Sequence, residues 1–262
     1  MAKLTKQQYK LHNEAVEYLQ QETLTFNEKL FVYNNWNESA ESINSQAGAF
    51  FTPQGLAQDF SLEIIEDSTV VDLCAGIGML SFFAYHWKNA EVTCVELNPK
   101  YVEVGKKLLP EANWFNASIF DYESLGKYHQ SISNPPFGKI KTGIDSEIKS
   151  KLDYKGSEFE FITIEIASKI SDYGSFLVPQ GSTPFRYSGR HNLGGFEDLR
   201  LESKGYNPNG MKPPRKVQKF LKETQFNPIF NTGIDTSVYE KDWKGVSPLC
   251  EVINFDWKNL YY

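Results

Sequence analysis

The stretch Thr69 to Gly78, TVVDLCAGIG, decides the fold, because a short β-branched run ends in a glycine turn that opens a helix reaching about Trp87. The same rhythm then repeats along the chain: EVTCVEL at 91–97 precedes a helix that begins at Pro99, NWFNASIF spans 113–120, and HQSIS ends at 133. Strands that alternate with helices in this way predict βαβ units and a parallel sheet with helices on both faces.

The flanking segments extend this α/β core on both sides. Apolar residues at helical spacing predict two helices in the first 45 residues, and Gln54 to Ile65 predicts a third, with Thr52 as its N-cap and Pro53 at its first position. After the core we expect a loop at 138–157, a helix at 158–171, the strand GSFLVP, a helix near 215–224, and strands near 227–232 and 248–257. We therefore expect a helical extension at 1–49 and an α/β domain at 50–262 that carries an insertion loop at 181–215 and any functional site.

Length and composition favour one compact domain with appendages. The chain has 262 residues, of which 40% are hydrophobic, enough for one sizeable core. No apolar run approaches the roughly 18 to 20 residues that span a bilayer, and the N-terminus has no apolar signal-peptide core, which predicts a cytoplasmic protein without a membrane partner. Three cysteines without metal-like spacing predict neither a disulfide nor a zinc site.

The glycine turn at Asp72–Gly78 lets the backbone approach a bound cofactor without a Cβ in the way. Ser81 takes the place of the third glycine of a dinucleotide fingerprint, so the turn alone also fits an ordinary strand-to-helix connection. Glu96 ends the next strand, twenty positions after Gly76, where a carboxylate accepts both hydroxyl hydrogens of a ribose. The alternative for Glu96 is a charge that favours the N-terminus of the following helix.

The most specific signal is Asn134-Pro135-Pro136-Phe137, directly after the strand-like SIS. Two prolines stiffen the backbone, so the Asn134 side-chain oxygen and the Pro135 carbonyl are held as fixed acceptors that can face one amino group. Phe137 can stack on a planar ring, a contact of roughly 1–3 kcal/mol per base. A front segment, Phe50-Phe51-Thr52-Pro53, precedes the sheet and by itself also fits a simple helix start.

Charge is unevenly distributed along the chain. The net charge of -6 argues mildly against nucleic-acid binding, but residues 181–225 carry nine basic and four acidic side chains, which leaves that segment at +5 and the rest at -11. A basic segment supports a nucleic-acid partner, and a solvated loop with scattered charges is the alternative.

These four signals, in this order and spacing, resemble the adenine N6 type of amino-group methyltransferases over about Phe50 to Pro179. The front segment, the nucleotide-binding core and the NPPF motif resemble the γ arrangement of type I and related modification methyltransferases. The resemblance implies an α/β, Rossmann-like class I methyltransferase fold, with a mostly parallel seven-stranded sheet, an antiparallel C-terminal strand and N-terminal helices. It also implies S-adenosylmethionine as the cofactor, with no metal.

Carried over residue by residue, the resemblance implies cofactor contacts along the front segment, the glycine turn and the end of the next strand: Phe51, Thr52, Pro53, Asp72, Cys74, Ala75, Gly76, Gly78 and Glu96. It implies that Asn134, Pro135, Pro136 and Phe137 bind the target base. Many relatives have an acidic residue after strand three that contacts the cofactor's adenine; the aligned position here is Ser118, with Asp121 three residues later, and we expect one of these two to make that contact.

The resemblance therefore implies methyl transfer to adenine N6 in DNA, as in restriction-modification. Three alternatives stay open: adenine N6 in RNA, a glutamine side chain of a protein, and a non-catalytic scaffold subunit. The chain has no room for the separate target-recognition domain of many DNA-modifying relatives. We therefore expect the 181–215 insertion, the 138–157 loop, the N-terminal helices, a homodimer partner or a separate specificity partner to choose the substrate.

Overall fold

The computed structural model describes residues 4–37, 51–139, 144, 146–189, 213–229, 232–244 and 247–258. Within these residues one seven-stranded sheet has the order β3-β2-β1-β4-β5-β7-β6. The strands are β1 (Thr69–Leu73), β2 (Glu91–Glu96), β3 (Asn113–Asn116), β4 (Tyr128–Ser133), β5 (Ser171–Pro179), β6 (Pro228–Ile229) and β7 (Cys250–Asp256). The first five are parallel, and β7 runs antiparallel to both β5 and β6. This confirms the predicted fold class, with its antiparallel C-terminal strand.

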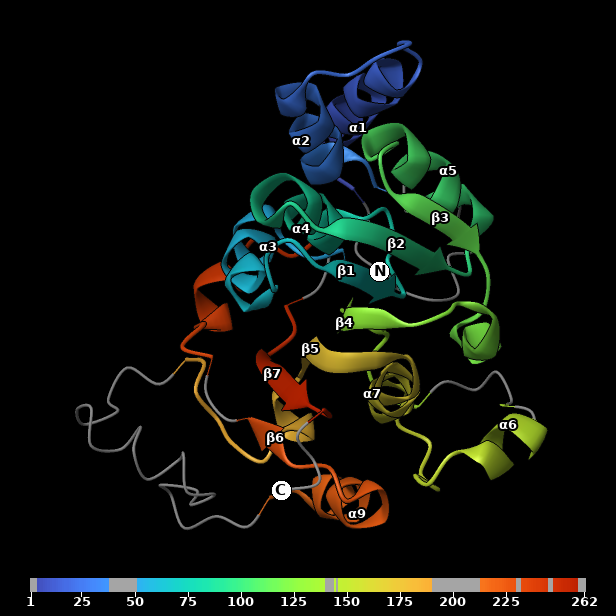
Figure 1. Cartoon of the computed structure of the whole chain (residues 1–262). Helices are drawn as coiled ribbons and strands as arrows, with labels where there is room; N and C mark the ends of the chain where they lie inside the picture. The colour runs from blue at the N-terminus through green and yellow to red at the C-terminus, as the bar shows by residue number, and fades with distance from the viewer. Residues whose placement is uncertain are drawn as a thin grey trace.

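Helices cover both faces of the sheet (Figure 1). One group comprises α1 (Lys6–Leu19), α2 (Phe26–Asn35), α3 (Gln54–Phe60), α4 (Met79–Lys88) and α5 (Pro99–Leu108). The other comprises α6 (Ser146–Lys151), α7 (Phe159–Ile170) and α9 (Arg215–Thr224). Short 3-10 segments are η2 (Ser61–Glu63), η3 (Ile119–Ser124), η4 (Gln180–Ser182) and η5 (Thr236–Tyr239).

Strand alternation builds a separate core on each face. Val70 and Val92 pack with the group that contains α3, α4 and α5, whereas Val71 and Val95 pack with α7 and α9 on the opposite face. Successive strand residues point to opposite faces, so neighbouring valines of one strand serve different cores. The burial of both faces accounts for the continuous apolar runs of these strands.

The N-terminal helices share the first of these cores. Ala15 of α1 and Val32 of α2 belong to the same buried cluster as Val70. Capping boxes begin both helices, with Thr5 and Thr25 each bonded to the third helical residue. α1 packs against α2, and α2 against α3, so the two helices extend the core on this side of the sheet. The expected domain boundary at 49/50 lies outside the described residues.

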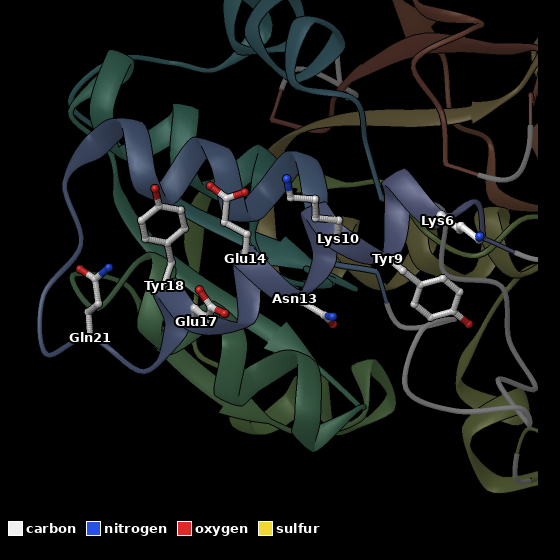
Figure 2. Close-up of a pocket in the computed structure, with 8 residues that line it drawn as sticks. All are labelled: Lys6, Tyr9, Lys10, Asn13, Glu14, Glu17, Tyr18 and Gln21. Atoms are coloured by element: carbon white, nitrogen blue, oxygen red, sulfur yellow. The ribbon is translucent and has the colours of Figure 1, made fainter.

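A shallow groove runs along α1 (Figure 2). All eight residues that line it come from α1 and the turn after it: Lys6, Tyr9, Lys10, Asn13, Glu14, Glu17, Tyr18 and Gln21. None of them is a predicted site residue. Among the described residues, no helix is both long and apolar enough to cross a membrane.

Several predicted boundaries were wrong. Pro53, not Thr52, is the N-cap of α3, and it makes no side-chain cap bond; the helix ends at Phe60 and a 3-10 turn follows. The 138–157 loop contains α6, whose six residues include none that is buried, so no apolar pattern marked it. β3 ends at Asn116, because the chain beyond it enters η3. Most of the 181–215 insertion lies outside the described residues.

Candidate active site

The turns that carry the predicted motifs meet at one edge of the sheet. Leu73 at the end of β1 is in register with Val95, and Asp72 is in register with Ile132 of β4. Because these strands are parallel, their carboxyl ends lie together, and the chain leaves the sheet there at the glycine turn, at Glu96 and at the NPPF motif.

The glycine turn has a backbone that requires left-handed conformations. The φ angles of Gly76 and Gly78 are 58° and 90°, and Cys74 also has a positive φ of 65°. A Cβ at Gly76 would lie 3.3 Å from the Phe51 ring, so the front segment packs directly against the turn. Glycine is therefore favoured at Gly76, both for its positive φ and for this close approach.

Glu96 ties the glycine turn to the end of β2. Its Oε2 accepts a hydrogen bond from the Gly76 backbone N–H at 2.8 Å, and its Oε1 accepts one from the Asn98 N–H, also at 2.8 Å. The backbone N–H of Ala75 donates to the Val95 carbonyl at 3.0 Å. Glu96, which is predicted to hold a ribose, therefore also holds the glycine turn in place.

Asp72 is a buried acid under the same turn. Its Oδ2 accepts a hydrogen bond from Ser81 Oγ at 2.7 Å, whereas Oδ1 has no hydrogen-bond partner among the described residues. Burial raises the pKa of Asp72 to about 7, the Ser81 bond lowers it, and the nearby Glu96 charge raises it. Ser81, which replaces the third fingerprint glycine, therefore serves to bind Asp72.

The front segment reaches the NPPF motif through one side-chain contact. Thr52 is buried, and its Oγ1 accepts a hydrogen bond from Asn134 Nδ2 at 3.0 Å. Phe51 packs edge-on against Trp36 and Tyr101, with ring centroids 5.8 and 5.2 Å apart. Residues 82 positions apart in sequence are thus bonded where the two motifs meet.

The NPPF motif is partly open to solvent. Pro135 is buried and Pro136 is exposed, while Phe137 is half-buried against the core that contains α3 to α5. Ser133 Oγ, one residue before the motif, donates to the Leu73 carbonyl and so bonds the end of β4 to the end of β1. The motif therefore begins at a strand end that is bonded to β1, and its half-buried Phe137 ring is partly accessible to a ligand.

Ser118 and Asp121 lie after β3 and cap each other. The Phe120 N–H donates to Ser118 Oγ at 3.2 Å, and the Ser118 N–H donates to Asp121 Oδ2 at 3.3 Å. This reciprocal cap begins η3. The expected contact of either side chain with a cofactor adenine stays a prediction.

Two neighbours of the site carry no sequence motif. The buried Tyr33 of α2 donates through its hydroxyl to the Gly78 carbonyl at 3.2 Å. The Trp114 ring lies over Gly78 and Gly105, and a Cβ at Gly105 would come within 2.1 Å of it. An aromatic residue in a helical pattern is typical of core packing, so nothing in the sequence pattern predicted that Tyr33 reaches the turn.

The residues fit the cofactor implied by the fold. The site combines a glycine turn with N–H groups at a sheet edge, two acidic side chains at Asp72 and Glu96, and aromatic rings from the front segment. These groups suit a molecule with a ribose, an ammonium group and an adenine. The buried Asp72 Oδ1, without a partner among the described residues, is an acceptor that a cationic ligand group could use.

Comparisons with known proteins agree with this fold. No protein-family model matches the chain. The tRNA1(Val) (adenine(37)-N6)-methyltransferase of Shewanella sediminis is 26% identical over 125 residues, which are 43% of this chain and 49% of that protein. The chain thus spans about half the length of the curated relative it matches.

Two solved structures are also similar. The type I restriction-modification methyltransferase subunit of Streptococcus thermophilus has a TM-score of 0.53 at 16% identity, over 81% of this chain and 45% of that one. A methyltransferase from Pyrococcus furiosus reaches 0.44 at 13% identity, over 81% and 87%. The first value shows a shared fold, and the second is too low to add to it. The shared fold is a Rossmann-like methyltransferase fold, in agreement with the fold that the sequence resemblance implies.

Proposed function

We propose that this chain transfers a methyl group from S-adenosylmethionine to the N6 amino group of adenine in nucleic acid, with DNA as the first expected substrate. The observation that carries the proposal is the Asn134–Thr52 hydrogen bond at the carboxyl end of β4. It joins the candidate base-binding motif to the segment that packs on the glycine turn. A methyl donor and a planar amino group would have to meet at this junction.

The amide of Asn134 has a defined orientation in this arrangement. Because Nδ2 donates to Thr52 Oγ1, the oxygen Oδ1 is the atom that Asn134 offers as an acceptor. Pro135 has no N–H, so its backbone offers only a carbonyl. Two acceptors on adjacent residues suit the two hydrogens of one amino group, and they would favour a tetrahedral nitrogen with a localised lone pair.

The chain's part in the reaction is to bind and align. When bound, the cofactor would supply a methyl group on a sulfonium sulfur. The new bond to the amino nitrogen would replace the bond to sulfur, which leaves as a neutral thioether, and the nitrogen would release one proton to solvent. Asn134 and Pro135 would draw the amino hydrogens, and Phe137 would stack on the ring and hold its plane. The cofactor would be held by the front segment, the glycine turn and the end of β2: Phe51, Thr52, Pro53, Asp72, Cys74, Ala75, Gly76, Gly78 and Glu96. Ser118 or Asp121 would contact its adenine. In a duplex the base must leave the stack, which costs a few kcal/mol.

RNA is the second candidate substrate. Its support is the curated relative named for adenine N6 methylation of tRNA, to which the chain is 26% identical over 125 residues. The basic segment at 181–225 suits either nucleic acid, because it would contact phosphates that both share. A partner that supplies target recognition, or a second copy of the chain, is compatible with both candidates.

The test is transfer of radiolabelled methyl from S-adenosylmethionine to DNA, RNA and a protein extract in parallel. The wild type is compared with Asn134→Ala and with Asn113→Ala, a matched control at an exposed asparagine at the start of β3, away from the carboxyl ends of the strands. We expect N6-methyladenine in nucleic acid from the wild type and Asn113→Ala, and a loss of at least about 100-fold in Asn134→Ala with cofactor affinity nearly unchanged.

Each substrate has its own outcome. Label in DNA supports the first candidate, and label only in RNA supports the second. Label only in protein, at glutamine, would keep the amino-group chemistry and refute the nucleic-acid substrate. Cofactor binding without transfer to any of the three would favour a non-catalytic scaffold, and equal turnover by Asn134→Ala would refute the role of the NPPF motif.

A further inference from the structure

A buried carboxylate lies directly behind the NPPF motif. Glu160, the second residue of α7, is fully buried. Its Oε2 accepts a hydrogen bond from the Gly138 backbone N–H at 2.8 Å, and its Oε1 accepts one from Ser182 Oγ at 2.7 Å and one from Lys216 Nζ at 3.2 Å. A buried charge is costly unless it is paired and hydrogen-bonded, and this one has both kinds of partner.

Gly138 is the residue that follows Phe137, and both of its backbone polar groups are bound by the start of α7. Its N–H donates to Glu160, and its carbonyl accepts from the Phe159 N–H at 2.9 Å. Its φ of +81° is a conformation that side chains with a Cβ rarely adopt. The exit of the motif is thus bonded to a helix whose own residues pack into the core.

The other two partners of Glu160 come from more distant parts of the chain. Ser182 ends η4, just after β5, and Lys216 is the second residue of α9. Lys216 Nζ also donates to Ser182 Oγ at 2.6 Å and lies 5.8 Å from the centroid of the Phe161 ring. One carboxylate therefore joins the motif exit to two further elements of the fold.

We propose that Glu160 is a positioning residue of the methyl-transfer site, which fixes the backbone at Gly138 and thereby the placement of Phe137 and Asn134. Lys216 and Ser182 hold the carboxylate in the orientation that receives the Gly138 N–H. This inference rests on the proposed function. It assigns to a buried glutamate, which touches neither substrate nor cofactor, a role in the rate of the reaction.

The chain contains a matched control for this role. Glu165 lies on the same helix and is equally buried. It accepts backbone hydrogen bonds from Asp153 at 2.5 Å and from Tyr154 at 2.9 Å, and it pairs with Lys169 at 3.7 Å. The two glutamates thus have the same chemistry, but only Glu160 is bonded to the motif.

The experiment measures methyl transfer, cofactor affinity and melting temperature for the wild type, Glu160→Gln, Glu165→Gln and the double variant Glu160→Gln/Lys216→Met. A glutamine at 160 has one oxygen and one amino group, so it cannot serve Gly138 and Lys216 as the carboxylate does. We expect kcat to fall about 10- to 100-fold in Glu160→Gln and to change less than about twofold in Glu165→Gln, with cofactor affinity unchanged in both.

The double variant tests the hydrogen bond to Gly138. Without Lys216 as a competing donor, the glutamine oxygen can accept the Gly138 N–H while its amide nitrogen donates to Ser182, so we expect kcat and melting temperature to recover together. A kcat that stays low when melting temperature recovers, or an equal kcat loss in Glu165→Gln, would overturn the positioning role. If Glu160→Gln fails to fold, the same comparison is made with Ser182→Ala, for which a several-fold kcat loss is expected and an unchanged kcat would overturn the role.

The outcomes for the two proposals are distinct. An active wild type with an unimpaired Glu160→Gln variant would overturn the positioning role and leave the proposed function intact. A wild type that methylates none of the substrates would overturn the proposed function, and this role with it.

Discussion

Asp72→Asn should change how the stability of the protein depends on pH. Burial raises the pKa of Asp72 from its ordinary 3.8 to about 7. The folded state therefore keeps a proton between about pH 4 and 7 that the unfolded state has lost. The resulting stability is fully present below the unfolded pKa and is lost as the pH rises through 7.

The magnitude follows from the size of this shift. Each unit of pKa shift corresponds to about 1.4 kcal/mol, so the roughly three-unit shift amounts to about 4 kcal/mol, of which about 3 kcal/mol is lost between pH 5 and pH 8. Asparagine has the same shape, and its oxygen can accept the Ser81 hydrogen bond, but it does not titrate. The variant should therefore gain about 3 kcal/mol relative to the wild type across this interval.

Urea unfolding at pH 5, 6.5 and 8 measures this difference directly. Asp153→Asn, at an exposed aspartate, is the control and should follow the wild type at every pH. The free energies of unfolding of wild type and Asp72→Asn should diverge as the pH rises. Parallel profiles for these two proteins would refute the assignment of the proton to Asp72.

Two further predictions concern side chains that join distant elements. Thr52→Val should lower kcat about 10-fold, because it removes the hydrogen bond to Asn134. Thr52→Ser keeps the hydroxyl and should have most of the wild-type kcat. A weaker cofactor affinity at constant kcat would instead assign Thr52 to the cofactor alone. Lys244 Nζ donates to the carbonyls of Tyr33 and Trp36 at 2.8 and 2.9 Å, and burial lowers the pKa of Lys244 to about 7. Between about pH 7 and 10.5 the unfolded state therefore keeps a Lys244 proton that the folded state has lost, so the free energy of unfolding of the wild type should rise with pH in that window. Because the side chain is partly exposed, we expect a rise of about 1 kcal/mol from pH 7.5 to 9. Urea unfolding of Lys244→Met should lack that rise.

Local pattern determined most of the fold. The alternation of β-branched runs with helices predicted the parallel strands β1 to β4, and GSFLVP predicted the last six residues of β5. The segment at 215–224 was predicted with the bounds that α9 has. Both succeed because strand and helix periodicities depend on residues that are close in sequence. The motifs also converge as expected, since parallel strands bring their carboxyl ends to one edge.

Tertiary contacts decided the rest. Thr52 has the residue type of an N-cap, but its hydroxyl binds Asn134, which is 82 positions away in sequence. α3 instead begins at Gln54, with Pro53 as an N-cap that makes no side-chain bond. No motif in the sequence marked Glu160 or Lys216, yet the buried Glu160 pairs with the partly exposed Lys216 behind the NPPF motif. By itself the sequence determined most of the strands and helices, and it predicted which turns meet at one edge of the sheet. Only the tertiary structure decided which buried polar groups pair with one another. Packing removes these groups from water, so each is stable only with a hydrogen-bond partner, and the partner is a residue that the topology brings close rather than one close in sequence.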